Sequence, residues 1–189
     1  MNVHSRQDAG PADPVEIGAC ALTIEDVNAI GRADAAVALN RDPGYVEAIR
    51  AGEAFLNQLL AEDGVIYGVT TGYGDSCTSE VPADLVEELP LNLSRFHGCG
   101  MGRHLSRTMA RAVMAVRLNS LAMGYSGVRW RLLERLETLL NADIVPLIPE
   151  EGSVGASGDL TPLSYVAALL VGERQALVKG EETSARAAH

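Results

Sequence analysis

Two long stretches of this chain are apolar on nearly every side when they are drawn as helices. They cover residues 110–123, inside a helix expected at 106–123, and residues 163–171, which follow Thr161-Pro162. A helix without a polar face needs neighbours on all sides. Residues 128–140 add a further helix with leucines gathered on one side. The sequence therefore predicts a mainly α fold that belongs to a large assembly or packs against a missing partner.

Local signals place the other elements. Thr23 precedes an acidic first turn and is typical of an N-capped helix, and Asp42-Pro43 opens a second one. Residues 83–96 are expected to form a helix that kinks at Pro90. Residues 65–69 (VIYGV) are a short β-prone run. One or two short strands are thus expected among the helices, near the loop that follows residue 69.

The length of 189 residues suits one domain. Residues 1–20 are rich in Ala, Gly, Pro and Asp, and residues 176–189 are polar, so both are expected to be flexible tails. The domain itself is expected at residues 21–175. There are no internal repeats.

Composition and charge exclude several classes of protein. The net charge of −10 argues against nucleic-acid binding, since such a chain repels phosphates. The longest apolar run, residues 166–171, is too short to cross a bilayer, and no secretory signal opens the chain. The three cysteines form no CxxC pair and the four histidines have no metal-ligand spacing. The expectation is a cytoplasmic protein without a metal and without a membrane or nucleic-acid partner.

The most informative stretch is residues 152–163 (GSVGASGDLTPL). Its three glycines permit backbone conformations that other residues resist, and the loop leads into a helix whose first turn contains Pro162. Such a junction directs free N–H groups and a positive dipole end toward the loop. From the glycines alone, an anion-binding turn and a purely structural turn both remain open. A Walker loop is excluded because the Gly-Lys-Ser/Thr ending is absent.

Together with three other segments, this stretch resembles the aromatic amino acid ammonia-lyase family, which comprises histidine, phenylalanine and tyrosine ammonia-lyases and related aminomutases. The other segments are residues 67–74 (YGVTTGYG), 92–100 (NLSRFHGCG) and 117–129 (RLNSLAMGYSGVR), and all four follow the family order. The resemblance runs from about Leu22 to Glu173. It implies the N-terminal portion of the helical, fumarase/aspartase-like lyase fold.

The resemblance also implies a prosthetic group made from the chain itself. In the family an Ala-Ser-Gly tripeptide cyclises to 4-methylidene-imidazol-5-one (MIO), and here the tripeptide is Ala156-Ser157-Gly158. Gly158 has no side chain, so its backbone nitrogen can reach the carbonyl carbon of Ala156, while Ser157 loses its hydroxyl. The uncharged electrophile takes up the substrate amine and makes it a better leaving group. Asp159 is expected to support this loop and to cap the helix that follows.

The family motifs imply roles for five further residues. Tyr67 corresponds to the general base that removes the β-carbon proton, and Gly74 lies in the lid over the substrate. Phe96 and His97 fall at positions that select the substrate ring, although this mixed pair matches no single specificity. Asn119 is expected to be structural or to line the site. Without the resemblance, Tyr67 reads as an ordinary strand residue, Gly74 as a turn and His97 as a surface or capping residue.

The resemblance covers roughly the first third of the family's enzymes. The remaining part normally brings an Asn near MIO, an Arg for the substrate carboxylate and a second Tyr, so a second lyase subunit and oligomerisation are expected. A naturally split lyase, a truncated product and a non-catalytic remnant are the three explanations, and the polar last residues favour the split enzyme. The expected reaction eliminates ammonia from L-tyrosine, L-phenylalanine or L-histidine to give an arylacrylate. An aminomutase component and a binding or assembly module are the alternatives.

Overall fold

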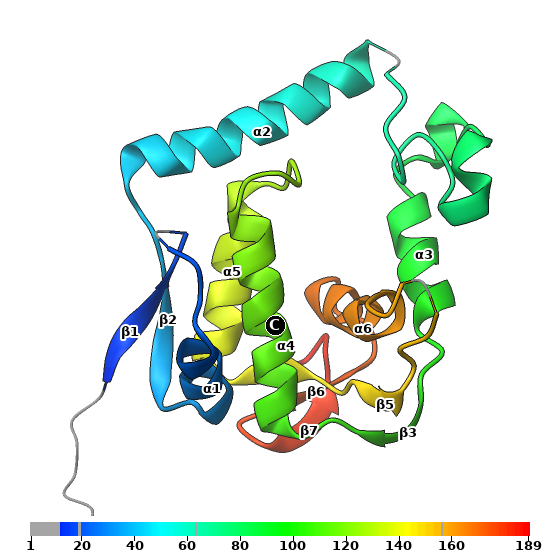
Figure 1. The fold of residues 1–189 in the computed structure, drawn as a ribbon. Helices are drawn as coiled ribbons and strands as arrows, with labels where there is room; N and C mark the ends of the chain where they lie inside the picture. Colours follow the sequence, from blue (N-terminus) through cyan, green and yellow to red (C-terminus); the bar gives the residue numbers. More distant parts are fainter. Residues whose placement is uncertain (1–11, 19, 63, 156) are drawn as a thin grey trace, which may run out of the picture.

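Helix α4 (Arg107–Ala122) runs through the centre of the computed structural model, with the other elements arranged around it (Figure 1). The structure describes residues 12–18, 20–62, 64–155 and 157–189. The described residues form β1 (Ala12–Ile17), α1 (Ile24–Arg32), β2 (Ala35–Leu39), α2 (Pro43–Ala61), η1 (Gly74–Thr78), η2 (Ala83–Leu85), α3 (Leu89–His97), β3 (Met101–His104), α4, α5 (Trp130–Asn141), β4 (Ile144–Pro146), β5 (Pro149–Glu151), α6 (Leu160–Leu170), β6 (Gln175–Val178) and β7 (Glu181–Ser184).

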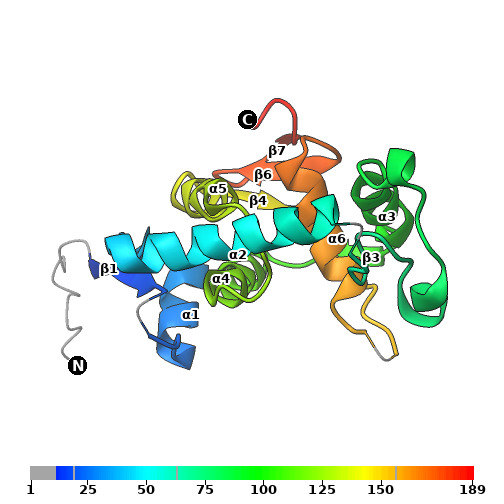
Figure 2. The ribbon, with the colours of Figure 1, turned by 90° about the horizontal axis from the view of Figure 1, so that it is seen from above.

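The core forms where α4 packs against α1 and α5. Met114 and Leu118 of α4 and Leu133 and Leu136 of α5 are completely buried. α2 lies across one end of α4 and α5, as the view from above shows (Figure 2). α6 packs against α3, away from the α1 side of the molecule. The predicted mainly α fold is confirmed.

The helix signals in the sequence mark real helix ends. Thr23 and Asp26 form a capping box at the start of α1, and the side chain of Asp42 accepts a hydrogen bond from the Tyr45 N–H at the start of α2. Ser106 accepts one from the Met109 N–H at the start of α4. Each of these side chains satisfies a backbone N–H that the first helical turn leaves free.

The region around Pro90 differs from the prediction. The expected helix at 83–96 is divided into the short η2 and α3, and Pro90 lies in the first turn of α3. Proline is tolerated there because the first turn needs no N–H donor, so it does not kink the helix. Residues 65–69 form no strand; residues 67–70 are in turns, and Thr71 and Glu80 form a single bridge.

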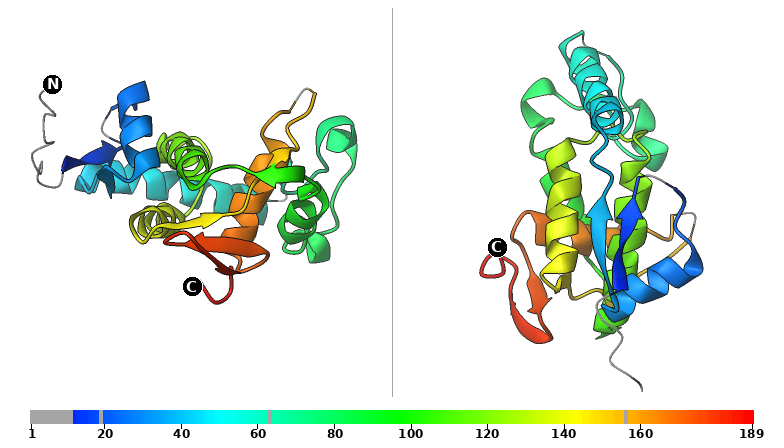
Figure 3. Two further views of the ribbon diagram at one scale, coloured as in Figure 1. Left: turned by 90° about the horizontal axis from the view of Figure 1, so that it is seen from below. Right: turned by 90° about the vertical axis from the view of Figure 1, so that its left-hand side faces the viewer.

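The described part of the expected N-terminal tail is ordered as a strand. β1 pairs in parallel with β2, with Ile17 opposite Leu39 and Val15 opposite Val37 (Figure 3). Ile17, Val37 and Leu39 are buried in the core. The composition of residues 1–20 concealed this strand, because its few apolar residues alternate and need a partner strand to be buried. Residues 1–11 lie outside the described residues.

The expected C-terminal tail at 176–189 also differs from the structure. β6 and β7 form a hairpin, and β6 pairs antiparallel with β4. Ala176 and Ala185 are completely buried. Both alanines belong to the main hydrophobic core, and small residues among polar ones give a weak sequence signal.

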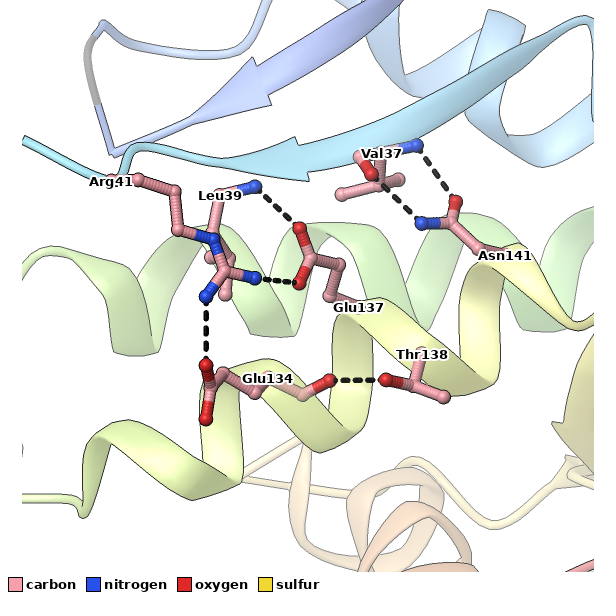
Figure 4. A network of polar contacts seen from close by, with 7 residues as sticks. All are labelled: Val37, Leu39, Arg41, Glu134, Glu137, Thr138 and Asn141. Carbon is pink, nitrogen blue, oxygen red and sulfur yellow. Dashed lines mark hydrogen bonds and ion pairs between the residues drawn. The ribbon is translucent and has the colours of Figure 1, made fainter.

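A polar network attaches β2 to α5 (Figure 4). The Val37 N–H donates to the Oδ1 of Asn141 at 2.9 Å, and the Nδ2 of Asn141 donates to the Val37 carbonyl at 2.8 Å. The Leu39 N–H donates to Glu137, which also pairs with Arg41 at 2.7 Å. These side chains satisfy backbone groups at the free edge of a two-stranded sheet.

No helix among the described residues is long and apolar enough to cross a membrane. The same part of the chain contains no group of three or more His, Cys, Asp or Glu side chains suited to hold a metal ion.

Candidate active site

The glycine-rich loop lies between β5 and α6. Val154 and Ser157 form a bridge across it, and Gly155 adopts a positive φ of 53° that favours glycine. The hydroxyl of Ser157 donates to the Oδ1 of Asp159 at 3.0 Å. Ala156, the first residue of the predicted tripeptide, lies outside the described residues. The loop therefore holds the serine side chain immediately before a helix N-terminus.

Two glycines of this loop are closely approached by side chains. A Cβ at Gly158 would lie 2.9 Å from the hydroxyl oxygen of Ser153. A Cβ at Gly152 would lie 2.5 Å from the Cγ2 of Thr161 in α6. A larger residue at either position would push the neighbouring side chain aside, so close packing favours glycine at both positions.

Asp159 does not cap α6 with its side chain. It is the residue before the helix, but its backbone has helical angles (φ −93°, ψ −17°) and its carboxylate makes no capping hydrogen bond. A capping side chain normally requires an extended backbone at this position. The carboxylate instead accepts the hydrogen bond of Ser157, which fits the other half of the prediction, that Asp159 supports the loop.

Tyr67 lies in a turn, with 64% of its surface exposed. Its hydroxyl oxygen accepts a hydrogen bond from the Gly74 N–H at 2.9 Å. Its ring meets the ring of Tyr73 edge to face, with centroids 6.1 Å apart. These two contacts set the direction of the Tyr67 phenol. Burial, together with the nearby Tyr67, raises the pKa of Tyr73.

The end of α3 orients Phe96 and His97 differently. Phe96 is 79% exposed, whereas His97 is half-buried and lines a cavity. The Nδ1 of His97 lies 3.0 Å from the carbonyl of Leu93. Because a carbonyl only accepts, Nδ1 is the donor in this contact, and a ring with a single proton has Nε2 as its acceptor.

An ion pair links α3 to the residues after α6. The Nε of Arg95 donates to both carboxylate oxygens of Glu173, at 3.0 and 3.1 Å. The hydrogen bonds and charge of Arg95 lower the pKa of Glu173. Arg174 donates to the carbonyl of Gly98 at 2.8 Å. These contacts hold the helix end that carries His97 against the α6 side of the molecule.

Two adjoining cavities lie along α4 and α6. One, of about 360 Å³, is lined by Tyr73, His97 and residues of α4, α5 and α6. The other, of about 530 Å³, is mostly apolar and reaches Gly158. Arg117 and Asp159 line both. Of the predicted residues, Gly158 lines one of these cavities, His97 lines the other, and Asp159 lies between them.

Other predicted residues do not line these cavities. Tyr67 and Gly74 contact the cavity that contains His97 only through their neighbour Tyr73. The side chain of Phe96 is exposed to solvent. Asn119 is half-buried on α4. Two lining residues, Tyr73 and Arg117, received no role from the sequence. A single arginine on an otherwise apolar helix face was the available signal for Arg117.

Comparison with known proteins shows which sequences and structures the chain resembles. A sequence profile described as aromatic amino acid lyase matches residues 22–189. The chain is 42% identical to histidine ammonia-lyase of Streptococcus pyogenes serotype M1 over 167 residues, which is 88% of this chain and 32% of that protein. The chain therefore spans about a third of the length of that relative.

Solved structures give the same result. The crystal structure of tyrosine aminomutase from Streptomyces globisporus matches with a TM-score of 0.83 and 36% identity, over 93% of this chain and 32% of that one. Histidine ammonia-lyase from Trypanosoma cruzi matches with a TM-score of 0.80 and 30% identity, over 94% of this chain and 33% of that one. With its four ordered motifs and its fold, the chain belongs to the aromatic amino acid lyase family.

Proposed function

We propose that this chain carries the MIO-forming loop and the general base of an ammonia-lyase that converts an L-aromatic amino acid to an arylacrylate. The observation that carries the proposal is the loop at 152–158. It presents the Ser157 hydroxyl to the carboxylate of Asp159, a residue that lines both the cavity reaching Gly158 and the cavity containing His97.

The residues present fit the formation of MIO. The backbone nitrogen of Gly158 would bond to the carbonyl carbon of Ala156, whose oxygen leaves as one water. Ser157 would lose its hydroxyl and its α-proton as a second water. Gly158 has no Cβ to hinder the attack, and Asp159 orients the hydroxyl that leaves. The finished group would supply an uncharged electrophile for the substrate amine.

The other side chains would bind the substrate and move its proton. Tyr67 would accept the β-carbon proton, with its phenol oriented by the hydrogen bond from the Gly74 N–H. The Nε2 of His97 would accept a hydrogen bond from a phenol O–H or an imidazole N–H in the cavity that His97 lines. L-Tyrosine, L-histidine and L-phenylalanine are all substrates to be tested, and the mixed Phe96-His97 pair favours none of them outright.

The rest of the active site would come from a polypeptide that corresponds to the two thirds of the relatives' sequences that this chain does not match. We propose that a second lyase subunit supplies it within an oligomer. Val116 of α4 and Phe55 of α2 are more than half exposed, which fits further helices packing there. The three cysteines are unpaired and exposed, which fits a reducing cytoplasm.

Intact mass spectrometry tests the proposal on the chain itself. Cyclisation predicts a mass lower than that of the sequence by two waters, and Ser157→Ala should abolish this loss. A chain that keeps its full mass even when co-expressed with the completing polypeptide would contradict the proposal and support the non-catalytic binding module.

Product analysis distinguishes a lyase from an aminomutase. It uses the completed enzyme, meaning this chain assembled with the proposed second subunit. A lyase releases ammonia and an arylacrylate, whereas an aminomutase returns the amine to the β-carbon. The structural likeness to a tyrosine aminomutase keeps this second candidate in the test. If a β-amino acid were the main product, the aminomutase proposal would replace the lyase proposal.

A further inference from the structure

Tyr67 and Tyr73 bind each other's neighbours in the chain. The hydroxyl oxygen of Tyr67 accepts from the N–H of Gly74, the residue after Tyr73, at 2.9 Å. The hydroxyl of Tyr73 donates to the carbonyl of Gly68, the residue after Tyr67, at 2.8 Å. These two hydrogen bonds and the edge-to-face ring contact are called here the tyrosine clasp. It joins the two ends of the segment 67–74 twice.

The clasp is closely packed at Gly68. This residue has a φ of 73°, and a Cβ there would lie 2.7 Å from the Cε1 of Tyr73. The Tyr73 ring therefore occupies the space that any side chain at position 68 would need. Tyr73 is half-buried, whereas Tyr67 is largely exposed, so the inner ring supports the outer one.

Threonines brace the segment between the two rings. The buried hydroxyl of Thr71 accepts from the Gly68 N–H at 3.2 Å and donates to the Gly72 carbonyl at 3.0 Å. The hydroxyl of Thr70 accepts from the Ile66 N–H at 2.8 Å. Hydrogen bonds thus hold the backbone on both sides of Tyr67 in place. The orientation of the Tyr67 phenol ring depends on the clasp.

We propose that Tyr73 is a positioning residue, which fixes the phenol of Tyr67 through the Gly68 carbonyl and the ring contact. The inference rests on the proposed function for the role of Tyr67 as base. Because burial raises the pKa of Tyr73, this hydroxyl keeps its proton and continues to donate to Gly68. Tyr73 also lines the cavity that contains His97, so it connects the base to the substrate cavity.

Amide hydrogen exchange measured by NMR tests the clasp on the chain itself, without catalysis. Tyr73→Phe keeps the ring and removes the hydrogen bond to Gly68, which should free Tyr67 from Gly74. The Gly74 N–H should then exchange roughly five- to tenfold faster, the effect of losing one net hydrogen bond. Tyr67→Phe removes the acceptor directly and should give at least this increase. Tyr125→Phe, at a 90% exposed position, is the matched control and should change nothing.

Kinetics of the completed enzyme test the consequence. Because misplacing a catalytic group by about 1 Å can cost 10²-fold, Tyr73→Phe should lower kcat by roughly ten- to a hundredfold and leave KM within about twofold. An unchanged Gly74 exchange rate, or a wild-type kcat, in Tyr73→Phe would overturn the inference. A fully active Tyr67→Phe enzyme would instead overturn the proposed function, and the exchange rates would still report on the clasp.

Discussion

The Ser157 hydroxyl donates to the carboxylate of Asp159 across one intervening residue, at 3.0 Å. From the sequence alone, the carboxylate of Asp159 is expected to cap the N-terminus of α6, but in the structure it binds Ser157 instead. This contact orients the one side chain that would lose its oxygen in the proposed formation of MIO.

Replacing Asp159 by Ala should slow cyclisation. A hydrogen bond to a charged group contributes about 1.5–3 kcal/mol, so the two-water mass loss should develop roughly ten- to a hundredfold more slowly. A mass time course after synthesis measures this. Asp34→Ala, at an exposed turn, is the control. Equal rates in both variants would show that Asp159 has no part in cyclisation.

Removing the Tyr67 hydroxyl should stop turnover without affecting MIO. Tyr67→Phe should retain the two-water mass loss, because the ring is largely exposed and lies outside the 152–158 loop. The completed enzyme should form arylacrylate at less than about a hundredth of the wild-type rate, as expected for loss of a general base. Ultraviolet absorbance of the product provides the assay. A variant with normal turnover would exclude Tyr67 as the base.

His97, rather than Phe96, should control ring specificity, since only His97 lines the cavity. His97→Leu removes the acceptor for a polar ring and should lower kcat/KM for tyrosine or histidine relative to phenylalanine by roughly a hundredfold. Phe96→Leu should leave this ratio within about threefold. Competition assays with the three amino acids measure it. A larger effect at Phe96 than at His97 would contradict the assignment.

Asn141 should contribute more to stability than its neighbour Thr138. Asn141→Ala leaves both backbone groups of Val37 without their partner and should cost about 2–4 kcal/mol in the free energy of unfolding. Thr138→Ala removes only a bond to the carbonyl of Glu134 within the same helix and should change it by less than about 0.5 kcal/mol. Urea denaturation of both variants is the measurement (Figure 4). Similar midpoints would show that the edge of β2 does not depend on Asn141.

Acid should loosen the end of α3. Arg95 lowers the pKa of Glu173 in the folded chain, so this contact stabilises the fold above the ordinary glutamate pKa of about 4.3 and is lost as the pH falls through the lower, folded value. Amide exchange at His97 and Gly98 should therefore accelerate below that pH. Glu173→Gln should show fast exchange at every pH. Because the pair is exposed, added salt should weaken it as well.

The elements with strong local signals were predictable. Side chains at Thr23, Asp42 and Ser106 set helix starts, and the apolar faces of α4, α5 and α6 were visible in the sequence. β1, β2 and the β6–β7 hairpin were missed, because a short strand is stable only with its partner, which the local sequence does not identify. Pro90 was placed inside a helix that in fact begins one residue before it.

The sequence by itself determined the family, the order of its motifs and the residue types that the proposed cyclisation needs, because that cyclisation would involve only neighbours along the chain. Only the tertiary structure decided that Asp159 holds Ser157 instead of capping α6, that His97 faces the cavity while Phe96 faces solvent, and that Tyr73 supports Tyr67. Side-chain direction depends on burial and on hydrogen-bond partners elsewhere in the fold, and the letters of a motif do not specify these.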